Sequence, residues 1–269
     1  MKNMPRIYVN QTELYYEEHG QGTETLLFAH GLLWSSRMFA DQITFFKDRY
    51  RVIAYDHRGQ GQSSVAEGGY DMDTLTRDAV ALLDALKIDR CHFAGLSMGG
   101  FVGLRLASRH PDRVQSLTLI DTSAQAEPEE NIPRYRMLNR IVKMLGVWAV
   151  KRPVMKIMFG PSFLQDPNRR SLRKYWEQQL TRNSRSITRA VEGVIEREAV
   201  PPGALANIQC PTLVLVGAED VATVPAKSEY LAEHIPNAQL LIIPRAGHTS
   251  SVEEPDAVCE AMAAFLDKQ

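Results

Sequence analysis

The sequence is poor in cysteine. Its 269 residues include three, Cys91, Cys210 and Cys259, which are far apart and form no C-x-x-C pair. An odd number of widely spaced cysteines indicates neither a disulfide framework nor a zinc site. We therefore expect a protein of a reducing compartment, the cytoplasm, that holds no metal ion.

Long apolar runs and an excess of one charge are also missing. The longest apolar stretches, near Leu26–Trp34 and Leu145–Val150, are much shorter than the roughly 20 residues that span a bilayer. Residues 1–10 contain no apolar core of a secretory signal. The net charge of −1 gives no global reason to expect nucleic acid or an anionic membrane as a partner. We expect neither partner, and no feature of the sequence indicates an oligomeric state.

Apolar residues, in contrast, make up 44% of the chain, which is enough for a sizeable single core. Short apolar runs typical of strands alternate with amphipathic stretches typical of helices. The predicted strands are Arg6–Val9, Glu13–Glu17, Thr25–Ala29, Arg51–Tyr55, Cys91–Ala94, Val114–Ile120, Thr212–Val216 and Gln239–Ile243. The predicted helices of this part are Arg37–Phe46, Asp73–Leu86 with Asp73 as N-cap, Phe101–Arg109, Lys227–His234 and Asp256–Leu266. The order predicts an α/β fold with a mostly parallel eight-stranded sheet and helices on both faces.

The alternation stops between residues 125 and 203. Strand patterns are missing there, whereas Leu138, Ile141, Val142 and Leu145 recur at helical spacing. Prolines divide the segment into short helices. We predict a core of residues 1–124 and 204–269, with residues 125–203 inserted into it as a helical cap.

The predicted cap differs from the core in charge. It contains 15 Lys and Arg residues but 8 Asp and Glu residues, a balance of +7 that leaves −8 for the rest of the chain. Long basic side chains usually reach water, so a solvated outer face is the preferred interpretation. The alternative hypothesis is that cap arginines attract a substrate that carries a carboxylate.

Residues 95–99 (GLSMG) join the strand at Cys91–Ala94 to the following helix. A serine between two glycines at such a junction is typical of a nucleophile elbow, a tight turn that holds the serine at strained backbone angles and exposes its hydroxyl group. Ser97 is therefore the candidate nucleophile.

A serine nucleophile needs a base, and the base needs a group that orients it. Asp220 follows the predicted strand that ends at Val216, and His248 follows the next strand. The chain order Ser97, Asp220, His248 is that of a known serine–acid–histidine arrangement. Asp121, which ends the strand after the elbow helix, is the alternative acid.

The negative charge that develops on an attacked carbonyl oxygen needs donors that already point at it. His30 and Gly31 follow the predicted strand at Thr25–Ala29. We expect the backbone N–H groups of Leu32 and Met98 to form this oxyanion hole.

Five segments together resemble the α/β-hydrolase superfamily over nearly the whole chain. They are His30-Gly31, Asp56–Ser63, Gly95–Gly100, Gly217–Asp220 and Gly247-His248. Within the superfamily, Phe93–Gly100 and Gly247–Pro255 are most similar to the lactonase and small carboxylesterase branch, which includes 3-oxoadipate enol-lactonases. The resemblance implies an α/β-hydrolase fold and a serine hydrolase that cleaves a small-molecule ester or lactone with water and without a cofactor. Haloalkane dehalogenases and epoxide hydrolases of this fold are excluded, because they have aspartate at the position of Ser97.

The same triad also supports other reactions. The alternatives are hydrolysis of a C–C bond in a dienone and cofactor-free perhydrolysis of the haloperoxidase type. Some proteins of this fold keep the triad and act as small-molecule receptors. The residues that we expect to contact a substrate are Leu33, Trp34, Met137, Trp148, Met158, Phe159 and Thr249.

Overall fold

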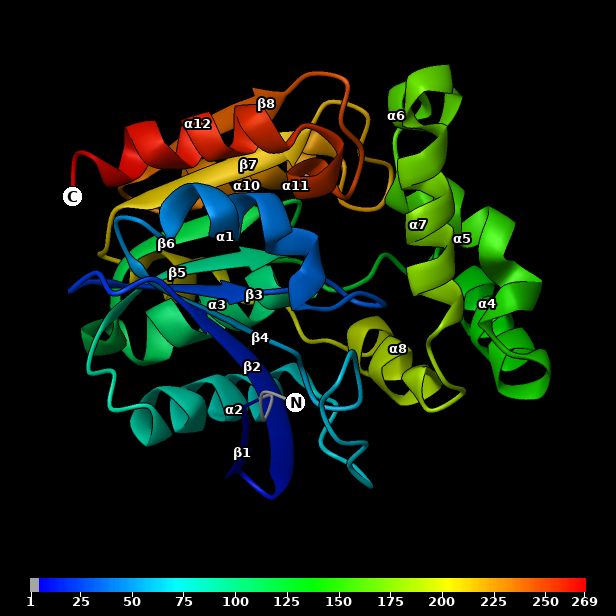
Figure 1. Cartoon of the computed structure of the whole chain (residues 1–269), viewed down its shortest axis with the longest axis horizontal. Coiled ribbons are helices and arrows are strands. Elements are labelled where there is room, and N and C mark those ends of the chain that lie inside the picture. Colours follow the sequence, from blue (N-terminus) through cyan, green and yellow to red (C-terminus); the bar gives the residue numbers. More distant parts are fainter. Residues whose placement is uncertain (1–4) are drawn as a thin grey trace.

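The computed structural model describes residues 5–269 and contains one eight-stranded sheet (Figure 1). Its strands are β1 (Arg6–Val9), β2 (Thr12–His19), β3 (Thr25–Ala29), β4 (Arg51–Tyr55), β5 (Cys91–Leu96), β6 (Val114–Ile120), β7 (Thr212–Gly217) and β8 (Ala238–Ile243). Their order in the sheet is β1-β2-β4-β3-β5-β6-β7-β8. Only β2 pairs antiparallel with its neighbours β1 and β4, and the other pairs are parallel. The predicted fold class is confirmed.

Helices cover both faces of the sheet because successive side chains of a strand point to opposite faces. Leu26 and Phe28 of β3 pack in one hydrophobic cluster with the helices α1 (Ala40–Phe46) and α12 (Pro255–Leu266). Leu27 and Ala29 pack in a second cluster with α2 (Met72–Ala85), α3 (Met98–Arg109) and α10 (Pro225–His234). Shorter elements complete the core: η1 (Ser36–Phe39), η2 (Pro111–Arg113), α9 (Pro202–Ala206) and α11 (Ser250–Glu253).

The start of α2 differs from the prediction. The N-cap is Asp71, whose carboxylate accepts a hydrogen bond from the backbone N–H of Thr74 at 2.8 Å. Asp73 lies in the first turn, and its carboxylate instead pairs with Arg105 and Arg109 of α3. Asp71 and Asp73 both lie just before the apolar stripe of α2. The spacing of apolar residues therefore cannot tell which of the two aspartates is the N-cap.

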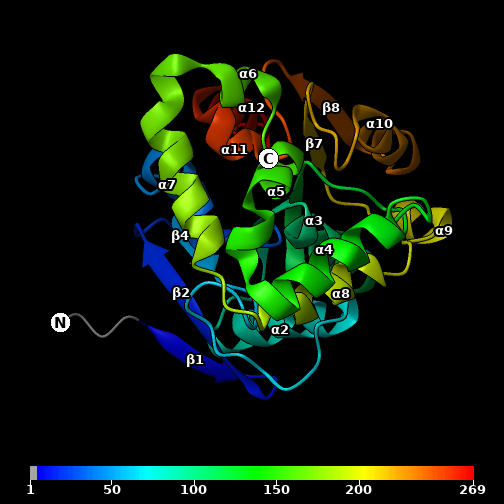
Figure 2. The same ribbon diagram turned by 90° about the vertical axis from the view of Figure 1, so that its right-hand side faces the viewer.

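Between β6 and α9, the chain forms a layer of helices beside the carboxyl ends of the parallel strands (Figures 1 and 2). We call α4 to α8 the helical layer. It comprises α4 (Ile132–Leu145), η3 (Val147–Val150), α5 (Lys151–Met158), α6 (Pro161–Gln165), η4 (Pro167–Arg169), α7 (Arg170–Thr181) and α8 (Ile187–Ile195). Helices α4 and α8 pack against each other in front of the core (Figure 2). The layer therefore covers the sheet edge where the loops after β3, β5, β7 and β8 emerge.

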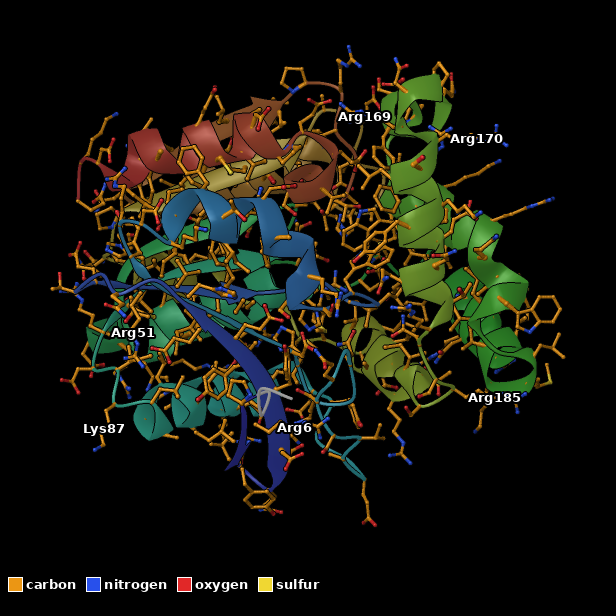
Figure 3. The ribbon with its side chains drawn as sticks, in the orientation of Figure 1. Arg6, Arg51, Lys87, Arg169, Arg170 and Arg185 are labelled. Carbon is orange, nitrogen blue, oxygen red and sulfur yellow. The ribbon has the colours of Figure 1, made fainter. Side chains whose placement is uncertain are left out.

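Basic side chains are distributed over the surface of both parts of the molecule. Arg169, Arg170 and Arg185 lie on the helical layer, whereas Arg6 and Lys87 lie on the core (Figure 3). Within residues 5–269, no helix is both long enough and apolar enough to cross a membrane.

Candidate active site

Ser97 occupies a sharp turn between β5 and α3. Its backbone angles, φ 51° and ψ −111°, lie outside the regions that non-glycine residues normally adopt. Two hydrogen bonds hold the turn: the Ser97 N–H donates to the Ile120 carbonyl at 2.8 Å, and the Thr122 hydroxyl donates to the Ser97 carbonyl at 2.8 Å. The surrounding structure thus maintains a strained conformation that places the Ser97 side chain at the end of the sheet.

The glycines on either side of Ser97 are required by close backbone contacts. A Cβ atom at Gly99 would lie 2.0 Å from the carbonyl oxygen of Ala29, and one at Gly95 would lie 2.3 Å from the carbonyl oxygen of Gly99. Both distances are far below van der Waals contact. The pattern glycine–any residue–serine–any residue–glycine therefore follows from the geometry of this turn.

Ser97, His248 and Asp220 form a continuous hydrogen-bonded chain of buried side chains. The distance from His248 Nε2 to Ser97 Oγ is 2.8 Å, and that from His248 Nδ1 to Asp220 Oδ2 is 2.9 Å. A carboxylate accepts only, so His248 Nδ1 carries the proton and Nε2 is free to accept the hydroxyl proton of Ser97. The arrangement can remove a proton from the serine.

Asp220 is held as an acceptor by its own loop. Its Oδ1 atom accepts hydrogen bonds from the N–H groups of Ala222 and Thr223 at 2.8 and 2.9 Å, and the Thr223 hydroxyl donates to Oδ2 at 2.8 Å. Burial alone would raise the pKa of Asp220, but the charge of His248 and these donors outweigh it and lower the pKa. Asp220 is thus ionised at neutral pH.

The pKa of His248 shifts in the opposite direction. Burial of the imidazole would lower its pKa, but the negative charge of Asp220 and the hydrogen bond to it raise the pKa above the ordinary value. The pair therefore favours positive charge on His248 more than solvent does, which is the property needed to stabilise an imidazolium formed during a reaction.

Asp121, the alternative acid, has other partners. Its Oδ1 atom accepts from the Gly217 N–H at 2.9 Å, and its Oδ2 atom accepts from the Ser250 N–H at 2.9 Å. Burial and the nearby charge of Asp220 raise its pKa to about 7. Asp121 therefore joins the loop that carries Asp220 to the loop that carries His248, and the structure places Asp220 rather than Asp121 against the imidazole.

The loop after β3 presents the amide of Leu32. His30 donates from Nδ1 to the Gly31 carbonyl at 2.7 Å and accepts at Nε2 from the His57 N–H at 2.9 Å. Leu33 has a positive φ of 75°, and its N–H donates to Gln60 Oε1 at 2.8 Å. Fixed on both sides in this way, the Leu32 amide lies in a preorganised turn.

The amides of Leu32 and Met98 share one further property. Within residues 5–269, neither N–H donates a hydrogen bond to a protein acceptor. For Met98 this follows from its place as the first residue of α3, because the first N–H groups of a helix have no partner inside it. Both donors are available to a ligand.

A cavity of ≈ 120 Å³ extends from Ser97 and His248 under the helical layer. Most of the side chains that line the cavity are aliphatic, and most of them come from α4, η3, α5 and α8. The lining comprises Leu32, Leu33, Ser97, Phe101, Glu127, Tyr135, Leu138, Asn139, Val142, Val147, Val150, Val154, Ile157, Met158, Ile187, Val191, Val194, Ile195, Arg197, Ala222, Thr223 and His248.

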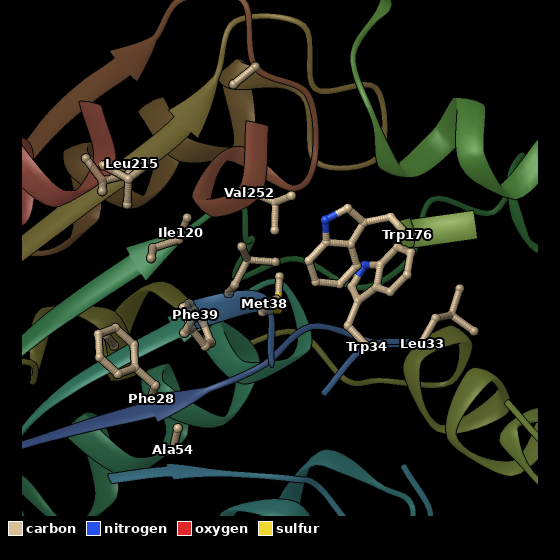
Figure 4. Packing of buried hydrophobic residues seen from close by; sticks show 14 of the residues in the cluster. Phe28, Leu33, Trp34, Met38, Phe39, Ala54, Ile120, Trp176, Leu215 and Val252 are labelled. Carbon is tan, nitrogen blue, oxygen red and sulfur yellow. The ribbon is translucent and has the colours of Figure 1, made fainter. Parts of the chain in front are cut away.

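Two of the seven predicted substrate contacts, Leu33 and Met158, line this cavity. Thr249 is buried beside it, and its hydroxyl donates to the Met158 carbonyl. Trp34 and Phe159 lie in the hydrophobic cluster next to it, with their ring centroids 5.7 Å apart. The centroid of the Trp34 ring lies 5.3 Å from that of the Trp176 ring (Figure 4). These three side chains support the wall without forming it.

Met137 and Trp148 lie elsewhere. Their side chains are 55% and 69% exposed, and neither lines the cavity. Helix α4 turns Leu138 and Val142 inward, so Met137, one residue earlier, points to the opposite side. We therefore correct the expectation that these two residues contact a substrate in this cavity.

Sequence reasoning missed two carboxylates that join the helical layer to the site. Glu253, which is fully buried, accepts from the N–H groups of Gly160 at 2.8 Å and Thr249 at 3.1 Å. Glu219 accepts from the Ser162 N–H at 2.8 Å. The adjacency of Glu219 to Asp220 and of Glu253 to the His248 loop was visible in the sequence, but their partners lie 57 and 93 residues away. Among residues 5–269, no group of three or more His, Cys, Asp or Glu side chains is arranged to hold a metal ion.

Comparison with known proteins agrees with this geometry. The profile of the alpha/beta hydrolase fold family matches residues 24–255. The chain belongs to this family. The hydrolase is 31% identical to 3-oxoadipate enol-lactonase 2 of Acinetobacter baylyi over 95% of its own length and 93% of that protein. It is also 31% identical to a protein of Azorhizobium caulinodans named as a candidate carbamate hydrolase, RutD, over 97% and 98% of the two chains.

Solved structures give the same result. The enol-lactonase of Burkholderia xenovorans superposes on the hydrolase with a TM-score of 0.90 at 28% identity and covers 98% of this chain and 100% of its own. A thermophilic esterase of Thermogutta terrifontis has a TM-score of 0.90 at 29% identity, with 98% of both chains covered. The predicted resemblance to α/β-hydrolases and enol-lactonases is thereby confirmed.

Proposed function

We propose that the protein is a serine hydrolase that cleaves a carboxylic ester or lactone of a small molecule through an acyl-enzyme intermediate. The observation that carries the proposal is the hydrogen-bonded chain of Ser97, His248 and Asp220 at one end of an apolar cavity. Each member has the chemical state that its role requires: a hydroxyl on a strained turn that lines the cavity, an imidazole with a free Nε2 and an ionised carboxylate.

In the first step, His248 accepts the proton of Ser97 as the hydroxyl oxygen attacks the substrate carbonyl. Asp220 holds the imidazole in the required tautomer and stabilises its positive charge. His248 then gives the proton to the leaving alkoxide, and the acyl group stays on Ser97. From an ester the alkoxide departs as an alcohol, whereas from a lactone it remains on the acyl chain as a hydroxyl group. Water, activated by the same imidazole, hydrolyses the acyl-enzyme.

The amides of Leu32 and Met98 are the proposed donors to the oxyanion. Neither N–H group has a protein acceptor among the described residues, and one begins α3, where the helix dipole favours negative charge. Donors fixed in advance stabilise the tetrahedral intermediate without reorganisation during the reaction. Gln60, through its hydrogen bond to the Leu33 N–H, is a positioning residue for this loop.

We further propose that residues 125–203 act as the cap of the site. Helices α4, α5 and α8 of this segment form most of the cavity wall. Glu219 and Glu253 fix its middle to the loops of the catalytic acid and base. The cap thus determines the shape of the space next to Ser97.

The bond that is cleaved can be tested with a substrate panel. Relatives named as enol-lactonases and esterases favour lactones and carboxylic esters, and a relative named as a candidate carbamate hydrolase makes carbamate the second candidate. We expect hydrolysis of esters or lactones to exceed that of carbamates, of dienone C–C bonds and of acetate with peroxide. Faster turnover of a carbamate, of a dienone or of acetate with peroxide would contradict the proposed reaction and favour the corresponding one.

The raised pKa of His248 predicts a specific pH profile. The general base must be neutral, so kcat/KM is expected to fall about tenfold per pH unit below the pKa of His248. Because Asp220 raises that pKa, the acidic limb should lie above the ordinary histidine value of about 6.5. Steady-state kinetics from pH 5 to 9 measure the limb, and circular dichroism over the same range verifies that the fold persists. A limb clearly below pH 6.5 in folded enzyme would contradict the proposed role of Asp220.

A further inference from the structure

We propose that the hydrolase selects uncharged, predominantly aliphatic esters or lactones and that Glu127 excludes substrates with a carboxylate in the cavity. This inference rests on the proposed function, because it concerns the group that occupies the cavity next to Ser97. It goes beyond that function in naming the substrate class and the residue that sets it.

The wall of the cavity provides the first support. Val142, Val150, Val154, Ile187 and Val191 belong to the aliphatic surface that faces the bound group. The cavity volume, ≈ 120 Å³, is of the order that accommodates a small apolar molecule. An ionised group without a partner is strongly disfavoured in such surroundings, because it loses its hydration.

Apart from His248, which is paired with Asp220, one basic and one acidic side chain line the cavity, and they neutralise each other. Arg197 Nη1 lies 2.9 Å from Glu127 Oε2, and the two side chains are only 2% and 7% exposed. Arg197 also donates to the carbonyls of Gln125 at 3.2 Å and Val194 at 2.8 Å. Its guanidinium carbon lies 4.4 Å from the centroid of the Phe101 ring. The arginine is thus fixed and paired before any substrate enters.

The nearby charges do not alter this balance. Lys227 does not line the cavity, and the carboxylates of Glu127, Asp220 and Glu130 already act electrostatically on its amine. The remaining polar side chains of this part of the wall, Tyr135 and Asn139, are uncharged, since burial and Glu127 raise the pKa of Tyr135. A substrate carboxylate would therefore meet the carboxylate of Glu127, and the described residues that line the cavity offer no unpaired cation to compensate for it.

The exposed arginines of the cap do not line the cavity. Arg170 and Arg185 lie at its outer surface (Figure 3), and solvent and salt screen exposed charges over about 10 Å. The hypothesis that cap arginines attract an acidic substrate requires a free arginine in the cavity. Arg197, the cavity arginine among the described residues, has a carboxylate partner instead.

Two isosteric esters test the inference on the wild-type enzyme. Ethyl 5-methylhexanoate and the anion of monoethyl glutarate differ only in that an isopropyl end group replaces a carboxylate. We expect kcat/KM for the neutral ester to exceed that for the anion by at least about a hundredfold, because the anion must be desolvated beside Glu127. A second pair, with the same two end groups on the alcohol, tests the other orientation of the substrate. Equal rates, or faster hydrolysis of the anion, in both pairs would overturn the inference.

The variant Glu127→Gln tests the assigned residue. Glutamine keeps the shape and an acceptor for Arg197 but removes the negative charge, so Arg197 becomes available to an anion. The preference for the neutral ester should decrease at least about tenfold, through better use of the anion. The matched control Glu130→Gln, three residues away and exposed, should keep the wild-type preference. An unchanged preference in folded Glu127→Gln protein would contradict the role of Glu127. If that variant does not fold, the kcat/KM ratios of the two ester pairs on the wild-type enzyme decide whether the inference holds.

The failure of this inference differs from the failure of the proposed function. Labelling of Ser97 by a fluorophosphonate, together with hydrolysis that favours the anion, would overturn the substrate class alone. Absence of labelling and of hydrolysis for all four esters would overturn the acyl-enzyme proposal and this inference with it.

Discussion

Replacement of Ser97 by alanine is expected to lower kcat for the best ester or lactone substrate by about six powers of ten. Alanine removes the atom that attacks the carbonyl, and no acyl-enzyme can form. The remaining amides of Leu32 and Met98 would still stabilise an oxyanion, which leaves a small rate above that in water. Steady-state assays of the purified variant measure this loss.

The matched control is Ser116→Ala. Ser116 is a buried serine of β6 whose hydroxyl lies 2.8 Å from His92 Nδ1, near the amino ends of β5 and β6, whereas Ser97 follows the carboxyl end of β5. We expect this variant to retain activity within about threefold, and Ser97→Ala to retain the wild-type melting temperature within a few degrees. Activity of Ser97→Ala above about one per cent of wild type, without contaminating hydrolase, would rule out Ser97 as the nucleophile.

Asparagine at position 220 is expected to lower kcat by about four powers of ten, as for other triads of this type. An amide group turned toward His248 Nδ1 no longer favours the tautomer with a free Nε2, and it carries no charge to stabilise the imidazolium. The backbone donors of Ala222 and Thr223 would hold the amide oxygen in place, so the fold should persist. Assays of kcat and of thermal unfolding separate the two effects.

The comparison variant is Asp121→Asn. Asp121 binds two backbone N–H groups and not the imidazole, so we expect at most about a tenfold loss of kcat together with lower thermal stability. Its pKa of about 7 means that it is already partly protonated at neutral pH, which limits the effect of removing its charge. The reverse result, a large catalytic loss at Asp121 and a small one at Asp220, would reassign the acid.

Much of the fold could be predicted because its information is local. The central strands β3, β4 and β6 have the predicted bounds, and β3 and β4 are nearly continuous apolar runs, as expected for strands buried on both faces. The choice between Asp71 and Asp73 as N-cap could not be made locally. It depends on Arg105 and Arg109 of α3, which attract Asp73 away from the helix end.

The tight turn at Ser97 could also be predicted from the sequence, because its close backbone contacts require glycine at positions 95 and 99. The cavity wall was not. Whether Met137 or Leu138 faces inward depends on how α4 packs on its neighbours, and both are apolar. The pair of Glu127 and Arg197 is separated by 70 residues, so only the folded chain shows that the cavity contains a neutralised arginine.

The most direct test of the account is to identify the residue that a fluorophosphonate modifies. The reagent forms a stable phosphonyl ester with an activated serine and releases fluoride. Mass spectrometry of the intact protein and of its peptides is predicted to show one adduct, on Ser97, that does not form in Ser97→Ala and forms much more slowly in Asp220→Asn. Full ester hydrolysis by protein whose Ser97 remains unmodified, or an adduct on another residue that abolishes activity, would contradict the account.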